Sequence, residues 1–316
     1  MKKACLLYLG AFLVLWLVVA VYVYLRLPGE VAAHGHGEPP DWWFAACAVG
    51  VGVVSSAFAT MGLGFLWGVM LKRKELGWVR RSLGGGMPRD GERGAAVGTI
   101  EATGEFVHAP ISGSRCVAFT YEIYHLPSGR SGSRVLDYNG FSLAPSAIST
   151  VGGAVALLAY PEFDFGEEYP DGEEAYRNAE EFIRATEFVD LGDGLDFRTN
   201  LAQVKELLAD DDGAIRKNWR HGRVDRDIRS LRLMEQRVEQ GDEVCAFGRY
   251  SSARGGFVPD PGSLELVPVR LLRGGGSAIA RKLAVRLLGS LIGGLIFLGL
   301  GGGAVIASFK FLPEFL

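Results

Sequence analysis

Residues 105–124 have the sequence EFVHAPISGSRCVAFTYEIY, which predicts a tight turn followed by a half-buried strand. Pro110 fixes its own φ angle and forces Ala109 to be extended, while Gly113 permits the chain to reverse. After the turn the residues alternate with a period of two, as in a strand that has one face in a core. The apolar face carries Val117, Phe119, Tyr121 and Ile123, and the opposite face carries Ala118, Thr120, Glu122 and Tyr124. We therefore expect a β-rich domain around this stretch.

Three long runs without charged residues or histidine lie outside this stretch, at residues 4–25, 42–71 and 287–309. Each is longer than the ~20 residues that a helix needs to cross a hydrocarbon core about 30 Å thick. The sequence therefore predicts an integral membrane protein with three transmembrane helices. Because the runs contain no ionisable residue of these types, no ion pathway or proton relay is indicated.

The first run could instead be a signal peptide, because Lys2 and Lys3 precede it and a cleavage site could lie at residues 31–33, Val-Ala-Ala. Its apolar stretch is longer than the ~7–15 residues of a signal-peptide core, so we favour an uncleaved anchor.

Basic residues predict the orientation of these helices, since cytoplasmic loops are rich in Lys and Arg. The loop between the first two runs carries only Arg26, against Glu30, Glu38 and Asp41. Basic residues instead follow the second run and precede the third: Lys72, Arg73, Lys74, Arg80, Arg81, Arg281, Lys282 and Arg286. In a bacterial inner membrane, this pattern places the N-terminus and the long central segment in the cytoplasm, with a short loop and a brief tail outside.

Two glycine-rich segments predict the domain boundaries. Residues 1–72 hold two transmembrane helices, and residues 73–94 form a linker that contains GGG at 84–86 and Pro88. A second linker, residues 274–286, begins with GGG at 274–276 and precedes the transmembrane helix at 287–309. We expect these flexible segments to isolate residues 95–273 as one soluble domain. The first segment lacks the lysine of a phosphate-binding GxxxxGK[ST] loop.

Within residues 95–273 the patterns predict an α+β fold, with a β-rich open barrel or sandwich and a helical insertion. Strands are expected at 96–102, 115–124, 133–139, 155–160 and 187–191, turns at 127–129, 139–140 and 152–153, and helices at 172–183 and 200–209. Residues 231–238 fit a helix or a strand, but the connector 239–242 before the apolar segment 243–248 favours a hairpin. A last strand, residues 263–272, contains Pro268 and is expected at a sheet edge.

The sequence contains no GxSxG, HExxH or Walker A motif and no fingerprint for a cofactor. Cys116 is the one candidate nucleophile, because Arg115 could lower its pKa and His108 or His125 could act as a base. Small buried cysteines are common where a strand enters a core, so we favour a structural role for Cys116. Three strand acids, Glu122, Asp137 and Glu235, have no partner that the sequence identifies, and neither has His221.

The sequence favours neither a metal site nor a nucleic-acid site. The pair His34 and His36, with nearby acids, could hold a metal ion, but a polar connector explains these residues as well. Residues 210–213, DDDG, do not fit a calcium loop. The acidic segment 161–213 is followed by a basic one, so the two are expected to pair, and the acidic half would oppose a nucleic-acid backbone. The four cysteines form no CxxC and imply no disulfide framework.

Small residues recur in the apolar runs at the GxxxG spacing, which lets helix backbones approach closely. The glycines concerned are Gly64 and Gly68, Gly289 and Gly293, and Gly299 and Gly303. Two interpretations stay open, a homo-oligomer interface and packing of the three spans against each other.

Residues 96–272 resemble the GIDE-type domain, also called the BAM or "beside a membrane" domain. The family's pattern of a proline followed closely by glycine and cysteine is similar to Pro110, Gly113 and Cys116. Its second block resembles GFSLAPSAISTVGG, with Gly140, Pro145, Thr150 and Gly152, and its third resembles VEQGDEVCAFGRY, with Gly241, Asp242 and Gly248. The resemblance implies a β domain next to a membrane and favours a strand at 231–238.

Eukaryotic mitochondrial members of this family carry a C-terminal RING finger and act as E3 ubiquitin ligases. This sequence has no cysteine after Cys245, so a RING is not expected and ligase activity is not carried over. The leading hypothesis is a non-enzymatic binding or scaffolding module with an unknown protein partner at the membrane face. The alternatives are an enzyme that uses Cys116 and a structural subunit of a membrane complex.

Overall fold

The computed structural model describes residues 10, 12–25, 41–126, 134–190, 214–221, 226–260 and 269–311, with the backbone alone at 41–45 and 308–311. The chain forms two compact units. The helical unit comprises Met1–Leu76 and Lys282–Leu316, and the β unit comprises Gly77–Arg281. Two long helices, α2 (Asp41–Leu83) and α5 (Gly276–Phe311), contribute residues to both units.

Both long helices meet the length and composition required to cross a membrane. The candidate spans are Ala46–Leu83 and Gly276–Ala307, with mean hydropathies of 1.8 and 2.1 in their most apolar windows. Only 22% and 17% of those windows are buried, whereas a core helix of a soluble protein is mostly buried. The first predicted span coincides in its described part with a shorter apolar helix, Phe12–Leu25. Among the described residues, two helices are therefore of membrane-spanning length.

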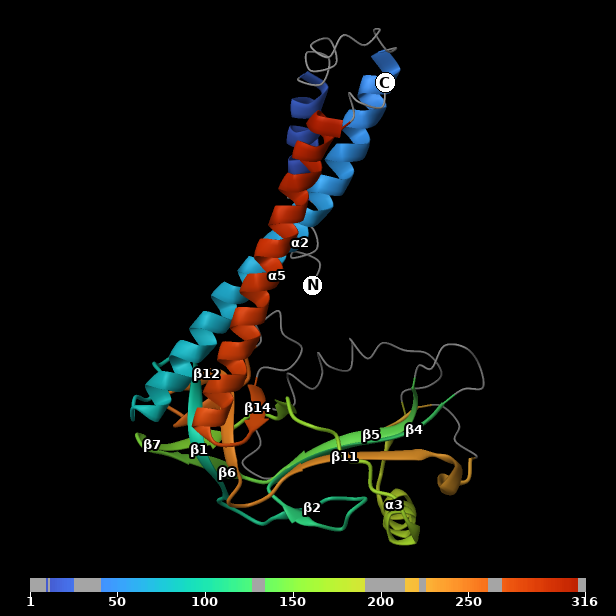
Figure 1. Ribbon diagram of the computed structural model, residues 1–316. Coiled ribbons are helices and arrows are strands. Elements are labelled where there is room, and N and C mark those ends of the chain that lie inside the picture. Colours follow the sequence, from blue (N-terminus) through green and yellow to red (C-terminus); the bar gives the residue numbers. More distant parts are fainter. Residues whose placement is uncertain are drawn as a thin grey trace. The chain divides into compact units, whose positions relative to one another are not determined.

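Within the helical unit, α2 and α5 lie side by side and antiparallel (Figure 1). A Cβ added at Gly294 would lie 3.2 Å from the carbonyl oxygen of Gly62, and one added at Gly301 would lie 3.0 Å from that of Ser55. The aromatic rings of Phe65 and Phe297 stack near this contact, with centroids 5.5 Å apart. Close backbone approach at glycine is the usual way in which apolar helices pack in a membrane.

The larger sheet of the β unit contains a closed ring of strands. Its strand order is β1-β6-β7-β13-β12-β14-β8, and an additional pairing of β1 with β12 closes the first five strands into a small barrel. The strands are β1 (Arg93–Ala102), β6 (Ser146–Thr150), β7 (Gly153–Leu157), β8 (Pro161–Phe163), β12 (Glu243–Ser251), β13 (Gly256–Val258) and β14 (Val269–Arg273). Ile100, Ile148, Val155, Val244 and Phe257 are fully buried in its core.

A five-stranded sheet, in the order β11-β4-β5-β10-β9, forms the second layer of the β unit. Its strands are β4 (Ala118–His125), β5 (Val135–Leu143), β9 (Val189–Asp190), β10 (Ile215–Arg220) and β11 (Arg232–Val238), and η1 (Ile228–Ser230) precedes β11. The helix α3 (Glu173–Ala185) packs Ala175 and Ala179 into the same core as Phe119, Tyr121 and Ile123. Three residues of the predicted apolar face, Phe119, Tyr121 and Ile123, are thus confirmed as core residues, whereas Val117 precedes β4 and belongs to the core of the barrel.

The prediction of a hairpin around residues 239–242 is wrong. Residues 231–238 do form a strand, but β11 pairs with β4 while β12 pairs with β1, β13 and β14. The turn between them therefore carries the chain from one sheet to the other. Gly241, with φ 88°, occupies this turn, and its amide donates to the carbonyl of Ile100 at 2.9 Å. Sequence spacing alone cannot distinguish a hairpin from such a crossover, because both need a short turn.

Gly140 lies inside β5, so the turn predicted at residues 139–140 is also wrong. A Cβ at Gly140 would lie 2.6 Å from both the Asn218 side-chain oxygen and the Lys217 carbonyl oxygen. A strand glycine here allows close approach of a neighbouring strand instead of a reversal. The helix predicted at 200–209 and the turn predicted at 127–129 lie outside the described residues.

The predicted linkers are ordered joints, and helix α2 continues to Leu83. The amide of Gly86 donates to the carbonyl of Arg81 at 2.9 Å, and that of Gly85 donates to Ser82 at 3.0 Å. With Gly85 at φ 79°, this is the Schellman arrangement that satisfies the last carbonyls of a helix. In the second segment α5 begins at Gly276, where an added Cβ would clash with Leu83 and Val97. The glycines are there for helix capping and close packing, not for flexibility.

Candidate functional site

The turn at residues 110–113 is held by a buried carboxylate from a distant strand. Glu235, on β11, is fully buried, and one of its oxygens accepts hydrogen bonds from the amides of Ile111 at 2.9 Å and Ser112 at 3.2 Å. Its other oxygen accepts from the Ser112 hydroxyl at 2.6 Å. The chain reverses at Gly113, with φ 69°, whose amide donates to the carbonyl of Ala109. Two amides and one hydroxyl of this turn therefore bind a carboxylate of the same chain.

Glu235 belongs to a network of acids and arginines that joins the two sheets. Arg237 contacts Glu235 at 3.3 Å and Glu168 at 2.6 Å. Arg273, on β14, contacts Asp242 through Nε at 3.2 Å and Glu168 at 3.9 Å. Glu168 and Glu235 also exchange two backbone hydrogen bonds of 2.9 Å. Because each buried charge here has a partner of opposite sign, the network fits a structural function.

Cys116 lies in the core beside this network. Its side chain is fully buried, and its thiol contacts the carbonyl of Val107 at 3.6 Å. Burial, with the nearby Glu235 carboxylate, raises the pKa of the Cys116 thiol to about 12. Arg115 does not contact the thiol but lies over the ring of Phe106, 3.6 Å from its centroid. A thiolate is the nucleophilic form, so this position is unsuited to nucleophilic catalysis.

The other residues of the three family-like blocks occupy turns and close contacts. The Thr150 hydroxyl donates to the carbonyl of Gly153 at 2.7 Å and accepts from the amide of Gly152 at 3.2 Å. Pro145 accepts a backbone hydrogen bond from Thr103 at 2.8 Å. Asp242 caps the Gly241 turn, because its carboxylate accepts a hydrogen bond from the Glu239 amide at 2.9 Å. A Cβ added at Gly248 would lie 3.0 Å from the Phe257 ring. These residues do not converge on a common pocket.

A polar cluster that the sequence does not identify lies on the five-stranded sheet. His125 contacts the Asp137 carboxylate through Nδ1 at 2.7 Å, and Arg226 contacts the other carboxylate oxygen at 3.0 Å. The Asp137 side chain is only 2% exposed. Close to it, His221 Nε2 is 2.7 Å from the side-chain oxygen of Asn139, and the His221 amide donates to the Asp137 carbonyl. Burial lowers the pKa of His221.

An irregularity in strand pairing creates this cluster. The β4–β5 register shifts between Ile123 and Tyr124, so that Ile123 faces Tyr138 whereas Tyr124 faces Leu136. Asp137 is the extra residue, and such bulges redirect a side chain out of the regular alternation. A carboxylate that orients a histidine is half of a nucleophile-activating arrangement. No serine, threonine or cysteine side chain of the described residues hydrogen-bonds to His125.

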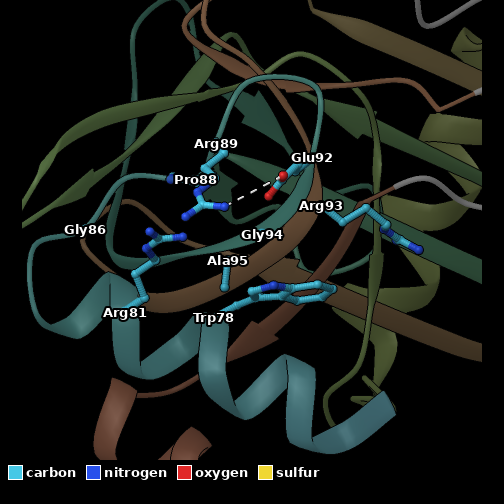
Figure 2. A pocket seen from close by; sticks show the side chains of 9 residues that line it. All are labelled: Trp78, Arg81, Gly86, Pro88, Arg89, Glu92, Arg93, Gly94 and Ala95. Carbon is cyan, nitrogen blue, oxygen red and sulfur yellow. Dashed lines mark ion pairs between the residues drawn. The ribbon is translucent and has the colours of Figure 1, made fainter. Parts of the chain in front are cut away.

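A second polar feature is a hollow between the end of α2 and β1, lined by Trp78, Arg81, Arg89, Glu92 and Arg93 (Figure 2). Arg81 extends toward Arg89 and Glu92, which form an exposed ion pair of 4.0 Å, while Arg93 points away. Gly86 and Gly94 also line this hollow. The hollow is basic and exposed, and its shape follows from the joint between helix and strand.

Four glycines of the predicted GxxxG pairs lie away from the contact between α2 and α5. A Cβ added at Gly68, Gly289, Gly299 or Gly303 would meet nothing within 4 Å. A Cβ added at Gly293 would lie 3.5 Å from the Phe65 ring of the partner helix, and Gly64 is half-buried on α2. The contact uses Gly62, Gly294 and Gly301, which lie on other faces of the same helices.

Over the described part of the chain, no group of three His, Cys, Asp or Glu residues is arranged to hold a metal ion. The histidines considered for a metal site, His34 and His36, lie outside the described residues. Comparison of the sequence and structure with protein-family models, curated proteins and solved structures gives no match. The proposals below therefore depend on this chain's own geometry.

Proposed function

We propose that this chain is a membrane-anchored, non-enzymatic binding or scaffolding module, in which three transmembrane helices hold a GIDE-type β domain at the cytoplasmic face. One observation carries the proposal. The chain continues from each end of the β unit as an apolar helix of membrane-spanning length, α2 at one end and α5 at the other. A domain attached at both ends has restricted reach and orientation, which suits the recruitment of a partner to a bilayer.

The joints support this proposal because they are built into the β unit. The Val97 amide of β1 donates to the Ser82 hydroxyl of α2 at 2.9 Å. Gly152, in the β6–β7 turn, packs against the helix cap, where an added Cβ would lie 2.5 Å from the Gly85 carbonyl oxygen. Gly152 is also one of the residues on which the resemblance to the GIDE-type domain is based.

The geometry favours binding over catalysis through Cys116, because that thiol is buried and its pKa is raised. An E3 ligase activity is suggested by the family resemblance alone, and the described residues contain no cluster of His and Cys ligands like that of a RING. The polar cluster at Asp137 is the part of the β unit where we expect a partner to be recognised. Arg226 leaves 48% of its side chain exposed there, while Asp137 fixes its position.

Affinity capture from mild detergent tests this function. The bait is the full chain, and its matched control replaces residues 95–273 with an unrelated soluble domain between the same two helices. We expect protein partners that the full chain retains and the control loses. Identical sets of captured proteins would contradict a binding function of the β domain. Reporters fused after Arg93 and after Leu316 test the orientation separately, with the first expected inside and the second outside.

A structural subunit of a membrane complex is the second candidate. The favouring observation is that Gly289, Gly299 and Gly303 are not used in the α2–α5 contact. These positions would permit close approach of another helix. Oligomer size in detergent, measured for bulky replacements at these glycines, distinguishes this candidate from the first.

A further inference from the structure

A collar of five basic residues lies in the helical unit where the uncharged runs of α2 and α5 stop. It consists of Lys72, Arg73 and Lys74 on α2 and of Lys282 and Arg286 on α5. On α2 these residues directly follow the uncharged run that ends at residue 71, and on α5 they directly precede the run that begins at residue 287. The collar therefore marks the same boundary on both helices.

Hydrogen bonds of Lys72 show that the two halves of the collar are at one level. Its ammonium group donates to the Ser290 hydroxyl at 2.5 Å and contacts the Arg286 carbonyl at 3.4 Å. Ser290 is buried and also donates to the same carbonyl at 3.0 Å. The antiparallel helices are thus locked with both basic segments side by side, and Lys72 is held between them.

The charge of this collar is almost entirely of one sign. Arg73, Lys74, Lys282 and Arg286 are exposed, and Glu75 is the one acidic residue between 72 and 76. Helix α5 contains no acidic residue along its whole length. Five cations and one anion give a local net charge of +4. Such a concentration of positive charge beside apolar helices is complementary to a surface of anionic headgroups.

We propose that the collar binds the headgroup phosphates of anionic phospholipids. Lipid is favoured over a soluble anion because the cations directly adjoin helix surfaces that are apolar and exposed, such as Leu71 and Leu288. An acyl chain can cover these surfaces while its phosphate reaches the collar. Arginine provides a planar fork for a phosphate, and lysine provides a compact charge. This inference rests on the proposed membrane anchoring and adds a lipid class to it.

The test uses the full chain in mild detergent, titrated with short-chain phosphatidylglycerol or phosphatidylcholine and followed by native mass spectrometry. A quadruple variant, R73Q/K74Q/K282Q/R286Q, removes the exposed collar charges and leaves Lys72 in its packed position. The control, R177Q/R184Q/R220Q/R229Q, removes four arginines from exposed ion pairs of the β unit. Unfolding of the β unit, followed in parallel, verifies that each variant is folded.

We expect the wild-type chain and the control to prefer phosphatidylglycerol, and the collar variant to lose roughly tenfold or more of that preference. Equal binding of the two lipids by the wild-type chain, or an unchanged preference in a folded collar variant, would overturn the inference. Displacement of phosphatidylglycerol by inorganic phosphate at the same concentration would also overturn the inference, because it would indicate a site for free anions. Membrane fractionation separates the two proposals. A wild-type chain that stays in the membrane fraction but does not prefer phosphatidylglycerol contradicts only lipid binding by the collar. A chain recovered in the soluble fraction contradicts the proposed membrane anchoring.

Discussion

The buried amide of Val97 donates a hydrogen bond of 2.9 Å to the hydroxyl of Ser82, which joins the first barrel strand to the last turn of α2. Ser82 is 3% exposed, and Val97 is 7% exposed. Because water cannot replace this acceptor in the buried joint, the bond makes the end of α2 part of the β unit. The last turn of α2 and the barrel should consequently resist separation at this point.

Replacement of Ser82 by alanine tests this joint. The variant leaves the Val97 amide without its acceptor, so we expect the β unit to lose about 1–3 kcal/mol of unfolding free energy. Chemical denaturation of the full chain in detergent, followed by tryptophan fluorescence, measures the change. Ser149→Ala, at an exposed strand position, is the matched control and should change stability by no more than about 0.5 kcal/mol. Equal effects of the two substitutions would show that the joint is not a stabilising contact.

Glycine substitutions on α5 should have opposite effects at two positions. Gly276→Ala places a methyl group against Leu83 and Val97, and we expect a loss of about 1–3 kcal/mol. Gly289→Ala meets no atom within 4 Å and replaces a helical glycine, so we expect no loss and a gain of up to about 1 kcal/mol. Thermal unfolding measures both. A neutral Gly276→Ala would mean that the second glycine segment is a hinge, as its composition alone suggests.

The turn around Ser112 should depend on the charge of Glu235. Glu235→Gln keeps the shape of the side chain but removes the carboxylate that accepts from two amides and one hydroxyl. Hydrogen bonds to a charged acceptor are the stronger ones, so we expect a loss of about 1–3 kcal/mol. Glu180→Gln, which breaks an exposed ion pair within α3, is the control and should cost less than about 0.5 kcal/mol. Hydrogen exchange at Ile111 and Ser112 would show whether protection of the turn is lost specifically.

Cys116 should resist alkylation while the protein is folded. Its burial and its pKa of about 12 keep the thiol protonated and out of reach at neutral pH. Iodoacetamide at pH 7 to 9, with peptide mapping by mass spectrometry, should label the Cys116 peptide only after denaturant is added. Labelling of the native protein that rises steeply near neutral pH would revive the proposal of a catalytic thiol.

His221 should make the folded state less stable in acid. Burial lowers its pKa in the folded protein, while the unfolded chain takes up the proton near pH 6.5. The unfolded state then binds more protons below that pH, so stability falls as the pH decreases through and below about 6.5. His221→Gln should reduce the difference in melting temperature between pH 7.5 and pH 5.5. An identical pH dependence in the variant would exclude His221 as its source, and His108→Gln, at an exposed position, serves as the control.

Substitutions of glycines in the helical unit distinguish the two interpretations of the GxxxG spacing, a homo-oligomer interface and packing of the spans against each other. Leucine at Gly62 or Gly294 should disturb the α2–α5 contact, because both approach the partner helix closely. Leucine at Gly299 or Gly303 has open space and should leave that contact intact. Crosslinking between cysteines introduced on α2 and α5 measures the contact, and size-exclusion chromatography in detergent measures oligomer size. If leucine at Gly299 or Gly303 makes the oligomer smaller and leucine at Gly62 or Gly294 does not, the result would support association of copies through the faces that carry Gly299 and Gly303.

The local features of this protein follow from its sequence. The alternation at Phe119, Tyr121 and Ile123 correctly predicted a core face, and the strand at 96–102 and the helix at 172–183 correspond to β1 and α3. Uncharged runs likewise identified two helices of membrane-spanning length. These features depend on neighbours within a few positions, where periodicity, charge and turn chemistry act directly.

Tertiary structure alone decided which distant residues meet. Glu235 lies 123 positions from Ser112, and the bulge that brings Asp137 to His125 depends on the pairing of two strands. The same holds for the glycine triplets, whose composition is equally compatible with a loose linker and with a tight joint. Only the packing partners distinguish these cases: the carbonyls that Gly85 and Gly86 cap, and the side chains that leave no room at Gly276. A local pattern states what a segment can do, and the contacts made across the fold select one of those possibilities.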